Sequence, residues 1–269
     1  MRGRIAVAVI AAAGALVAST SASPVAAQGQ PFTDRMVTSL SVQAQSEVRH
    51  ADGTVTDTWT VQGSPLSVEG PAHMSVTAEM GMVKGHERLV VSATPPPMPP
   101  VSLRLASTSY PIPYRSWCLT YYPNNDGEIH GCDYQQVVYE SGSTWYLSDK
   151  LTESGHYGNG FFDKSLLSEL IYITWPAKNL IVDWSPITAN IPVGSCTTAQ
   201  AGIAYYVTVN VSWTVCPSNW GLLGISNTAF GVVWNGASQS WEGVDGVDAV
   251  YNPSGASRTA TLHVSWAIL

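Results

Sequence analysis

Strict alternation of apolar and polar residues is the feature that most limits what this chain can fold into. Over 203–215 every odd-numbered residue is apolar, and polar residues fill the even positions from Thr208 onward. The stretches 72–82 and 260–268 repeat the alternation. Successive side chains of a β-strand point to opposite faces, so each stretch predicts a strand with one buried and one solvated face.

Turn-forming sequences between such stretches predict β-hairpins. Asn235-Gly236 tolerates positive φ at both positions, which suits a two-residue turn that sets Phe230 opposite Trp241. Gly142-Ser143 and Ala51-Asp52-Gly53 predict two further hairpins. Connections this short join antiparallel strands, so the sequence predicts antiparallel sheets.

One segment favours a helix, near 163–171. Asp163 can cap it, and four apolar residues recur on one helical face, namely Leu166, Leu167, Leu170 and Ile171. Elsewhere the low charged fraction of 12%, with 23 Gly and 17 Pro, suits strands and turns. We therefore predict an all-β fold: a disulfide-stabilised antiparallel β-sandwich, or flattened barrel, with about a dozen strands and this one short helix.

Residues 1–27 have the pattern of a secretory signal peptide. Arg2 and Arg4 precede an uncharged apolar run, and Val25-Ala26-Ala27 supplies small residues for cleavage before Gln28. No later apolar run reaches the ~18 residues that a membrane-spanning helix needs. We expect a secreted, extracellular protein whose mature chain has no transmembrane span.

A proline-rich segment at 95–100 divides the mature chain into an N-terminal β-rich part, 28–94, and a main β domain, 101–269. Consecutive prolines favour a stiff extended conformation. The segment is either a linker between two domains or a crossover within one sandwich, and both interpretations stay open.

Four cysteines in an exported chain predict two disulfides. Cys118 and Cys132 flank a turn-rich run symmetrically, so a hairpin there sets them opposite each other. Cys196 and Cys216 remain, but a single straight strand over 203–215 would hold them far apart. Either that strand bends, or Cys118 and Cys132 form their disulfides with Cys196 and Cys216 instead of with each other. No Cys-x-x-Cys spacing supports zinc.

The acidic balance of the chain excludes one class of partner. Removing Arg2 and Arg4 with the signal peptide leaves 10 basic residues against 19 acidic ones, a mature net charge of −9. A surface of that sign repels phosphate backbones, so we do not expect nucleic acid as a partner.

Carboxylates supply the candidate catalytic and metal-binding residues. Glu128, Glu242 and Asp245 could act as the acid and base of a glycosidase. Asn124, Asp126 and Glu128 could bind calcium, although polar residues are usual in any exposed turn. No other cofactor is expected. The nucleophile elbow, a complete zinc-protease motif and a phosphate-binding loop are all missing from the sequence.

Aromatic residues supply the candidate binding surface. The chain has 10 Trp and 12 Tyr against 4 Phe, a bias typical of aromatic surfaces that contact sugars or proteins. His156 and Tyr157 begin a glycine-containing loop, and Trp145, Trp234 and Trp241 stand beside predicted turns. Core packing is the alternative explanation for each ring.

The leading hypothesis is a secreted binding protein that recognises a glycan or a protein surface through aromatic-rich loops. The lack of a catalytic motif favours binding over catalysis. A glycosidase-like secreted hydrolase that uses the loop carboxylates is the alternative. A membrane-active, pore-forming β protein is the third hypothesis, because the strand over 203–215 has the alternation of a barrel wall.

Overall fold

A computed structural model describes most of the chain, over residues 36–40, 42–83, 86–97, 110–158, 165–185, 197–203, 209–215 and 221–268. The predicted signal peptide lies outside these residues, as do Asp163, Cys196 and Cys216. Among the described residues the only helical element is a short 3-10 turn, η1 (Pro123–Asn125), and none is a helix long and apolar enough to cross a membrane. The predicted all-β antiparallel fold is confirmed.

The described residues form 17 strands, more than the dozen expected. In chain order they are β1 (Met36–Leu40), β2 (Gln43–Arg49), β3 (Val55–Val61), β4 (Ser64–Gly70), β5 (Ser75–Val83), β6 (His86–Thr94), β7 (Ile112–Tyr121), β8 (Gly127–Ser141), β9 (Thr144–Tyr157), β10 (Leu166–Thr174), β11 (Leu180–Ser185), β12 (Thr197–Ile203), β13 (Val209–Val215), β14 (Gly221–Ser226), β15 (Ala229–Ser238), β16 (Glu242–Asn252) and β17 (Thr261–Ile268).

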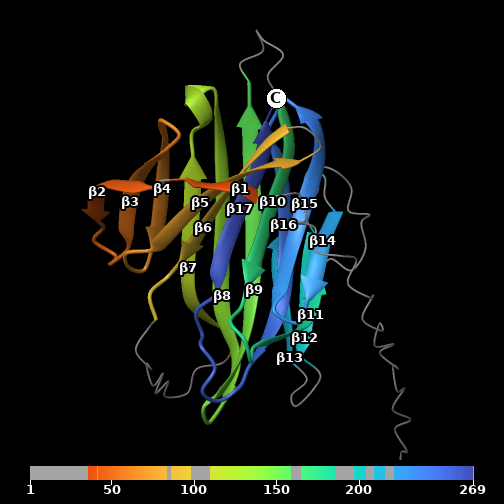
Figure 1. Cartoon of the computed structure of the whole chain (residues 1–269). Coiled ribbons are helices and arrows are strands. Elements are labelled where there is room, and N and C mark those ends of the chain that lie inside the picture. Colours follow the sequence, from red (N-terminus) through yellow and green to blue (C-terminus); the bar gives the residue numbers. More distant parts are fainter. Residues whose placement is uncertain are drawn as a thin grey trace, which may run out of the picture.

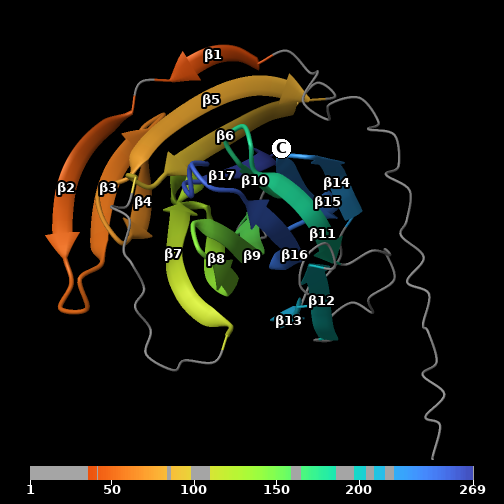
Figure 2. The same cartoon turned by 90° about the horizontal axis from the view of Figure 1, so that it is seen from below.

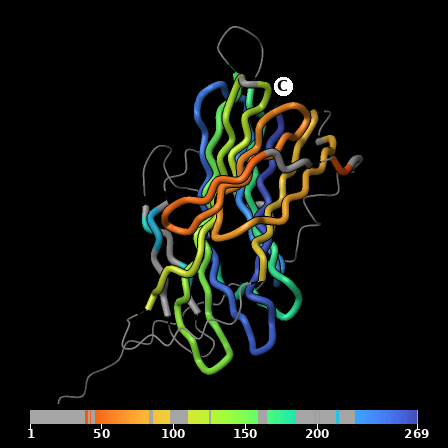
Figure 3. The backbone as a smooth tube through the Cα atoms, turned by 90° about the vertical axis from the view of Figure 1, so that its left-hand side faces the viewer, coloured from red at the N-terminus to blue at the C-terminus, as the bar shows by residue number. Residues whose placement is uncertain are grey.

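Two large sheets face each other as the layers of a sandwich (Figures 1 and 2). The seven-stranded sheet has the order β1-β5-β6-β17-β10-β15-β14, and the eight-stranded sheet has the order β11-β16-β9-β8-β7-β4-β3-β2. Most of the long strands run along one axis of the molecule (Figure 3). A separate hairpin, β12–β13, contacts the outer face of the eight-stranded sheet, where Trp213 Nε1 donates a hydrogen bond to Ser148 Oγ at 3.1 Å.

Strands from before and after the proline-rich segment pair with each other in both sheets. β4 pairs with β7 in the eight-stranded sheet, and β6 pairs with β17 in the seven-stranded sheet. The chain passes from one sheet to the other between Thr94 and Ile112. Buried side chains from both parts share one core, among them Val91, Leu147 and Val264.

The alternation predicted for individual strands explains which face each residue occupies. In β9 the odd-numbered Trp145, Leu147 and Leu151 lie in the core, while Lys150 and Thr152, on either side of Leu151, are partly exposed. The predicted hairpin turns at Gly142-Ser143 and at Ala51-Asp52-Gly53 are confirmed, because they join β8 to β9 and β2 to β3. The predicted Cys118–Cys132 disulfide is also confirmed, across β7 and β8.

The helix predicted near 163–171 is wrong for the described residues, which form β10. A register shift between Leu166 and Ser168 changes the phase of this strand. Leu166 and Ile171 face the core, while Leu170 on the opposite face is fully buried as well. A strand buried on both faces has a nearly continuous apolar sequence, which imitates helical spacing.

The two-residue turn predicted at Asn235-Gly236 is also wrong. Both residues lie within β15, where Asn235 pairs with Ser168 beside the register shift. A Cβ at Gly236 would lie 2.6 Å from a ring atom of Trp234, so the indole occupies the space beside this glycine. Asn-Gly here accommodates an irregular strand and a packed ring rather than a chain reversal.

The single strand predicted over 203–215 is replaced by the β12–β13 hairpin, which pairs Ile203 with Val209. Its register also pairs Thr197 with Val215, the residues next to Cys196 and Cys216 in the sequence. The geometric objection to a Cys196–Cys216 disulfide therefore falls away, although both cysteines lie outside the described residues.

Candidate functional site

The outer face of the seven-stranded sheet is polar over four adjacent strands. Along β5 the side chains of Ser75, Thr77 and Glu79 are exposed, whereas Ala78 lies in the core. The same two-residue period turns the even-numbered residues of β6 outward, because Val91 and Ala93 between them are core residues.

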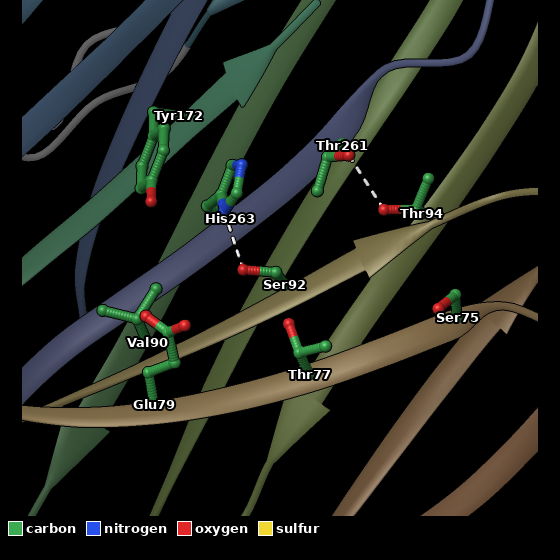
Figure 4. A pocket seen from close by; sticks show the side chains of 9 residues that line it. All are labelled: Ser75, Thr77, Glu79, Val90, Ser92, Thr94, Tyr172, Thr261 and His263. Carbon is green, nitrogen blue, oxygen red and sulfur yellow. Dashed lines mark hydrogen bonds between the residues drawn. The ribbon is translucent and has the colours of Figure 1, made fainter. Parts of the chain in front are cut away.

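Strand register brings these outward residues into rows that cross the sheet. In the central row Thr77 pairs with Ser92, Ser92 with His263, and His263 with Tyr172. Side chains opposed in this way on one face of a sheet lie close enough to interact. A cavity of about 410 Å³ is hollowed over this row, and its described lining residues, which we call the groove, are Ser75, Thr77, Glu79, Val90, Ser92, Thr94, Tyr172, Thr261 and His263 (Figure 4).

His263 is held rigidly at the centre of the groove. Its Nδ1 hydrogen-bonds Ser92 Oγ at 2.7 Å, and its Nε2 hydrogen-bonds Thr174 Oγ1 at 2.9 Å. The ring stacks on Tyr172 with a centroid distance of 4.1 Å and an interplanar angle of 2°. Burial lowers the pKa of His263 to about 4, so the imidazole is neutral at physiological pH. A neutral ring has one donor and one acceptor nitrogen, so one of the two hydroxyls donates and the other accepts.

Hydroxyl groups make up most of the remaining lining of the groove. Thr94 and Thr261 hydrogen-bond each other at 2.8 Å, and Ser75 and Thr77 stand exposed beside them (Figure 4). Burial, and then the charge of Glu79, raise the pKa of Tyr172, so its phenol stays protonated. Each hydroxyl can donate and accept a hydrogen bond, and together they form an array that suits a polyhydroxylated ligand.

The Ser92–His263 pair has the contact of a nucleophile with its general base, but its chemistry does not fit that role. A general base works best with a pKa near the operating pH, and the pKa of His263 is far below neutrality. The second ring nitrogen contacts the hydroxyl of Thr174 rather than a carboxylate, so an imidazolium would lack a stabilising charge there. The arrangement is suited to binding rather than to acyl transfer.

The carboxylates singled out from the sequence lie on two sides of the eight-stranded sheet. Glu128 pairs with His156, and Asp245 pairs with Thr152, all on the outer face. Glu242 is in phase with the core residue Val244 and faces the interior. The structure thus does not bring the three carboxylates together.

Three of the five predicted binding residues lie in the core. Trp145, Tyr157 and Trp234 fall on the inward faces of their strands and are buried. The other two meet on the outer face of the eight-stranded sheet, where Trp241, 52% exposed, lies with its ring centroid 4.4 Å from that of His156. This pair forms a small aromatic platform opposite the groove.

The proposed calcium ligands occupy the η1 turn and the start of β8. Asn124 has a positive φ of 49°, and the backbone N–H of Asp126 donates to the carbonyl of Pro123 at 2.9 Å. Within the described part of the chain, only one set of at least three His, Cys, Asp or Glu side chains is close enough to share a metal ion. That set is Cys118, His130 and Cys132, and its two thiols form the disulfide.

A second polar feature, which sequence reasoning missed, lies between the sheets. Besides Asp57, which contacts His73, five further acids are buried, a group we call the buried carboxylates: Asp133, Asp149, Glu153, Glu169 and Asp248. Burial is the main cause that raises the pKa of each, to about 6 for Asp149 and about 9 for Glu169. Asp149 pairs directly with Asp248 across β9 and β16. Acids at core positions of strands were a signal visible in the sequence.

Fold and groove together define a β-sandwich with a preformed polar groove on one outer face. No protein-family model, curated protein or solved structure matches the chain. The function therefore has to be inferred from the groove itself.

Proposed function

We propose that this protein is a secreted, extracellular binding protein that recognises a glycan in the groove. The observation that carries the proposal is the row of Thr77, Ser92, His263 and Tyr172, which sets hydroxyls beside a stacked pair of rings. Sugars offer the matching surface, because they combine many hydroxyls with apolar ring faces that pack on aromatic side chains.

The rigidity of the groove supports tight recognition. His263 is fixed by two hydrogen bonds and by its stack on Tyr172, and the hydroxyls stand on four hydrogen-bonded strands rather than on loops. A site that is already ordered loses little side-chain entropy when its ligand binds. The groove thus differs from the loop-borne site expected from the sequence, although the proposed ligand class is the same.

The lining distinguishes a glycan from an apolar small molecule. Sites for drug-like or apolar ligands are lined mainly by hydrophobic side chains. Of the nine described lining residues, Val90 is the only aliphatic one, and five carry an aliphatic hydroxyl: Ser75, Thr77, Ser92, Thr94 and Thr261.

Co-sedimentation of the purified exported protein with insoluble cellulose, chitin, xylan and peptidoglycan tests the proposal. We expect retention on at least one of them that persists in high salt, because stacking and hydrogen bonds depend little on charge. Tyr172→Ala should weaken this retention about tenfold or more, the usual effect of truncating an aromatic anchor.

Trp241→Ala is the matched control, because it removes an exposed ring from the opposite sheet. It should bind as the wild type does, and unfolding midpoints should show that both variants are folded. The proposal fails if no polysaccharide retains the protein, or if Trp241→Ala weakens binding while Tyr172→Ala does not.

A further inference from the structure

We infer that the groove prefers glycans that carry free amino groups over neutral or acidic ones, and that Glu79 is the residue that sets this preference. The inference rests on the proposed glycan-binding function and adds the charge of the ligand to it. It follows from two observations: Glu79 is a charged residue that lines the groove, and Arg88 is a nearby charged residue that does not.

Glu79 supplies the only side-chain charge among the nine described lining residues at neutral pH. Six of the others have aliphatic or aromatic hydroxyls, and Val90 is apolar. His263 does not offset Glu79, because burial lowers its pKa to about 4 and leaves the ring neutral. A ligand in the groove therefore meets one negative charge and no positive one from these residues.

Glu79 stands where a bound sugar would reach it. It is exposed on β5, two residues from Thr77 in the central row. Its charge contributes to the raised pKa of Tyr172, so the carboxylate acts on the phenol across the groove. Figure 4 shows Glu79 and Tyr172 at the same end of the cavity.

Arg88 is the nearest basic residue to the groove along β6, and its guanidinium contacts Ser168. Arg88 lies two residues before Val90, the residue that pairs with Glu79, and itself pairs with Gly81. Its side chain is buried, and its Nη2 donates a hydrogen bond to Ser168 Oγ at 2.7 Å. The charge of Arg88 does reach Tyr172, where it opposes the effect of Glu79 on the pKa. Arg88 does not line the groove, however, so the charged group that a ligand in the cavity can contact is Glu79.

An ammonium group on the ligand would form an ion pair with Glu79, whereas a carboxylate or sulfate would be repelled. Pairs between exposed groups of this kind change an equilibrium constant about two- to fivefold. The preference is therefore a modest bias added to the binding that hydroxyls and rings provide.

Calorimetric titration of the whole protein with two soluble tetrasaccharides tests the inference. One is a glucosamine tetramer and the other its N-acetylated counterpart, at about pH 6, where free carboxyl groups are ionised and amino groups are protonated. We expect the wild type to bind the amino form about two- to fivefold more tightly. Glu79→Gln should reduce that ratio to about one.

Glu69→Gln is the control for overall charge. Glu69 is exposed on β4 of the eight-stranded sheet, so the variant has the same net charge as Glu79→Gln but an intact groove. It should keep the wild-type ratio. A wild-type ratio of one, an unchanged ratio in Glu79→Gln or an equal fall in both variants would overturn the charge preference. If the charge preference fails but Tyr172-dependent binding to the N-acetylated form persists, glycan binding stands and only the preference for amino groups is wrong. If no glycan binds, both the glycan-binding function and the preference are wrong.

Discussion

Replacing Glu169 by glutamine should change how the stability of the fold depends on pH. Glu169 lies on β10, pairs with Trp234 on β15 and Trp266 on β17, and is fully buried. From β9 the backbone at Gly155 approaches so closely that a Cβ there would collide with Glu169 Oε1. Burial first, and then the charge of Glu242 on β16, raise its pKa from 4.5 to about 9.

The size of the effect follows from the two pKa values. Below 4.5 the carboxyl is protonated in both the folded and the unfolded chain, so it makes no pH-dependent contribution to stability. Above that pH the unfolded chain ionises while the folded one stays protonated until about 9, so stability falls by about 1.4 kcal/mol per pH unit. From about pH 5 to pH 7 the loss from this group is about 2–3 kcal/mol. The raised pKa values of Asp133, Asp149, Glu153 and Asp248 act in the same direction.

Urea unfolding followed by tryptophan fluorescence measures this directly. Glutamine keeps the shape of the protonated acid and cannot ionise, so Glu169→Gln should gain about 2–3 kcal/mol relative to wild type between about pH 5 and pH 7. Glu69→Gln, in which an exposed carboxylate is lost, should follow the wild-type pH dependence. A Glu169→Gln variant whose stability relative to wild type does not rise between these two pH values would refute the argument.

Two further predictions concern packing and disulfides. Gly246→Ala should destabilise the fold by about 1–3 kcal/mol in urea unfolding, because a Cβ there would lie 2.7 Å from Val232 Cγ1 and 2.9 Å from Phe230 Cζ; an unchanged midpoint would contradict this. Peptide mapping without reduction should find Cys196 joined to Cys216, as the register of β12 with β13 favours, and a peptide linking either to the first disulfide would contradict it.

The sequence predicted the class of fold because the two-residue period depends only on which face each residue occupies. The prediction of individual strands failed where the same period continued across a turn of the chain, as in β12 and β13. The odd-numbered Ala201 and Trp213 belong to different strands, yet both pack in the same cluster. The register pairs odd-numbered with odd-numbered positions, and opposed residues of an antiparallel pair share a face. The alternation therefore continues in phase through a reversal of the chain, and a hairpin resembles one long strand.

The groove could not be predicted in the same way, because it depends on sheet order. Its aliphatic hydroxyls come from β5, β6 and β17, and each of these strands alone shows only an ordinary solvated face. Hydrophobic periodicity does not specify which strands become neighbours. The prediction that Trp234 is an exposed binding residue was wrong for a related reason. Its neighbours Asn235-Gly236 form part of a strand instead of a turn, and the Trp234 ring lies in the core.

The position of β17 in the sheet means that the groove forms late in folding. β17 lies between β6 and β10, and Thr261 follows its partner Thr94 by 167 residues. A chain that emerges from its amino-terminal end presents all the other described strands before this one. Until β17 inserts, the edges of β6 and β10 that it will cover lack this partner, and such edges are prone to pair with other chains. The strand that covers these two edges also brings His263 into place, so the groove forms in the same step that protects the edges from pairing with other chains.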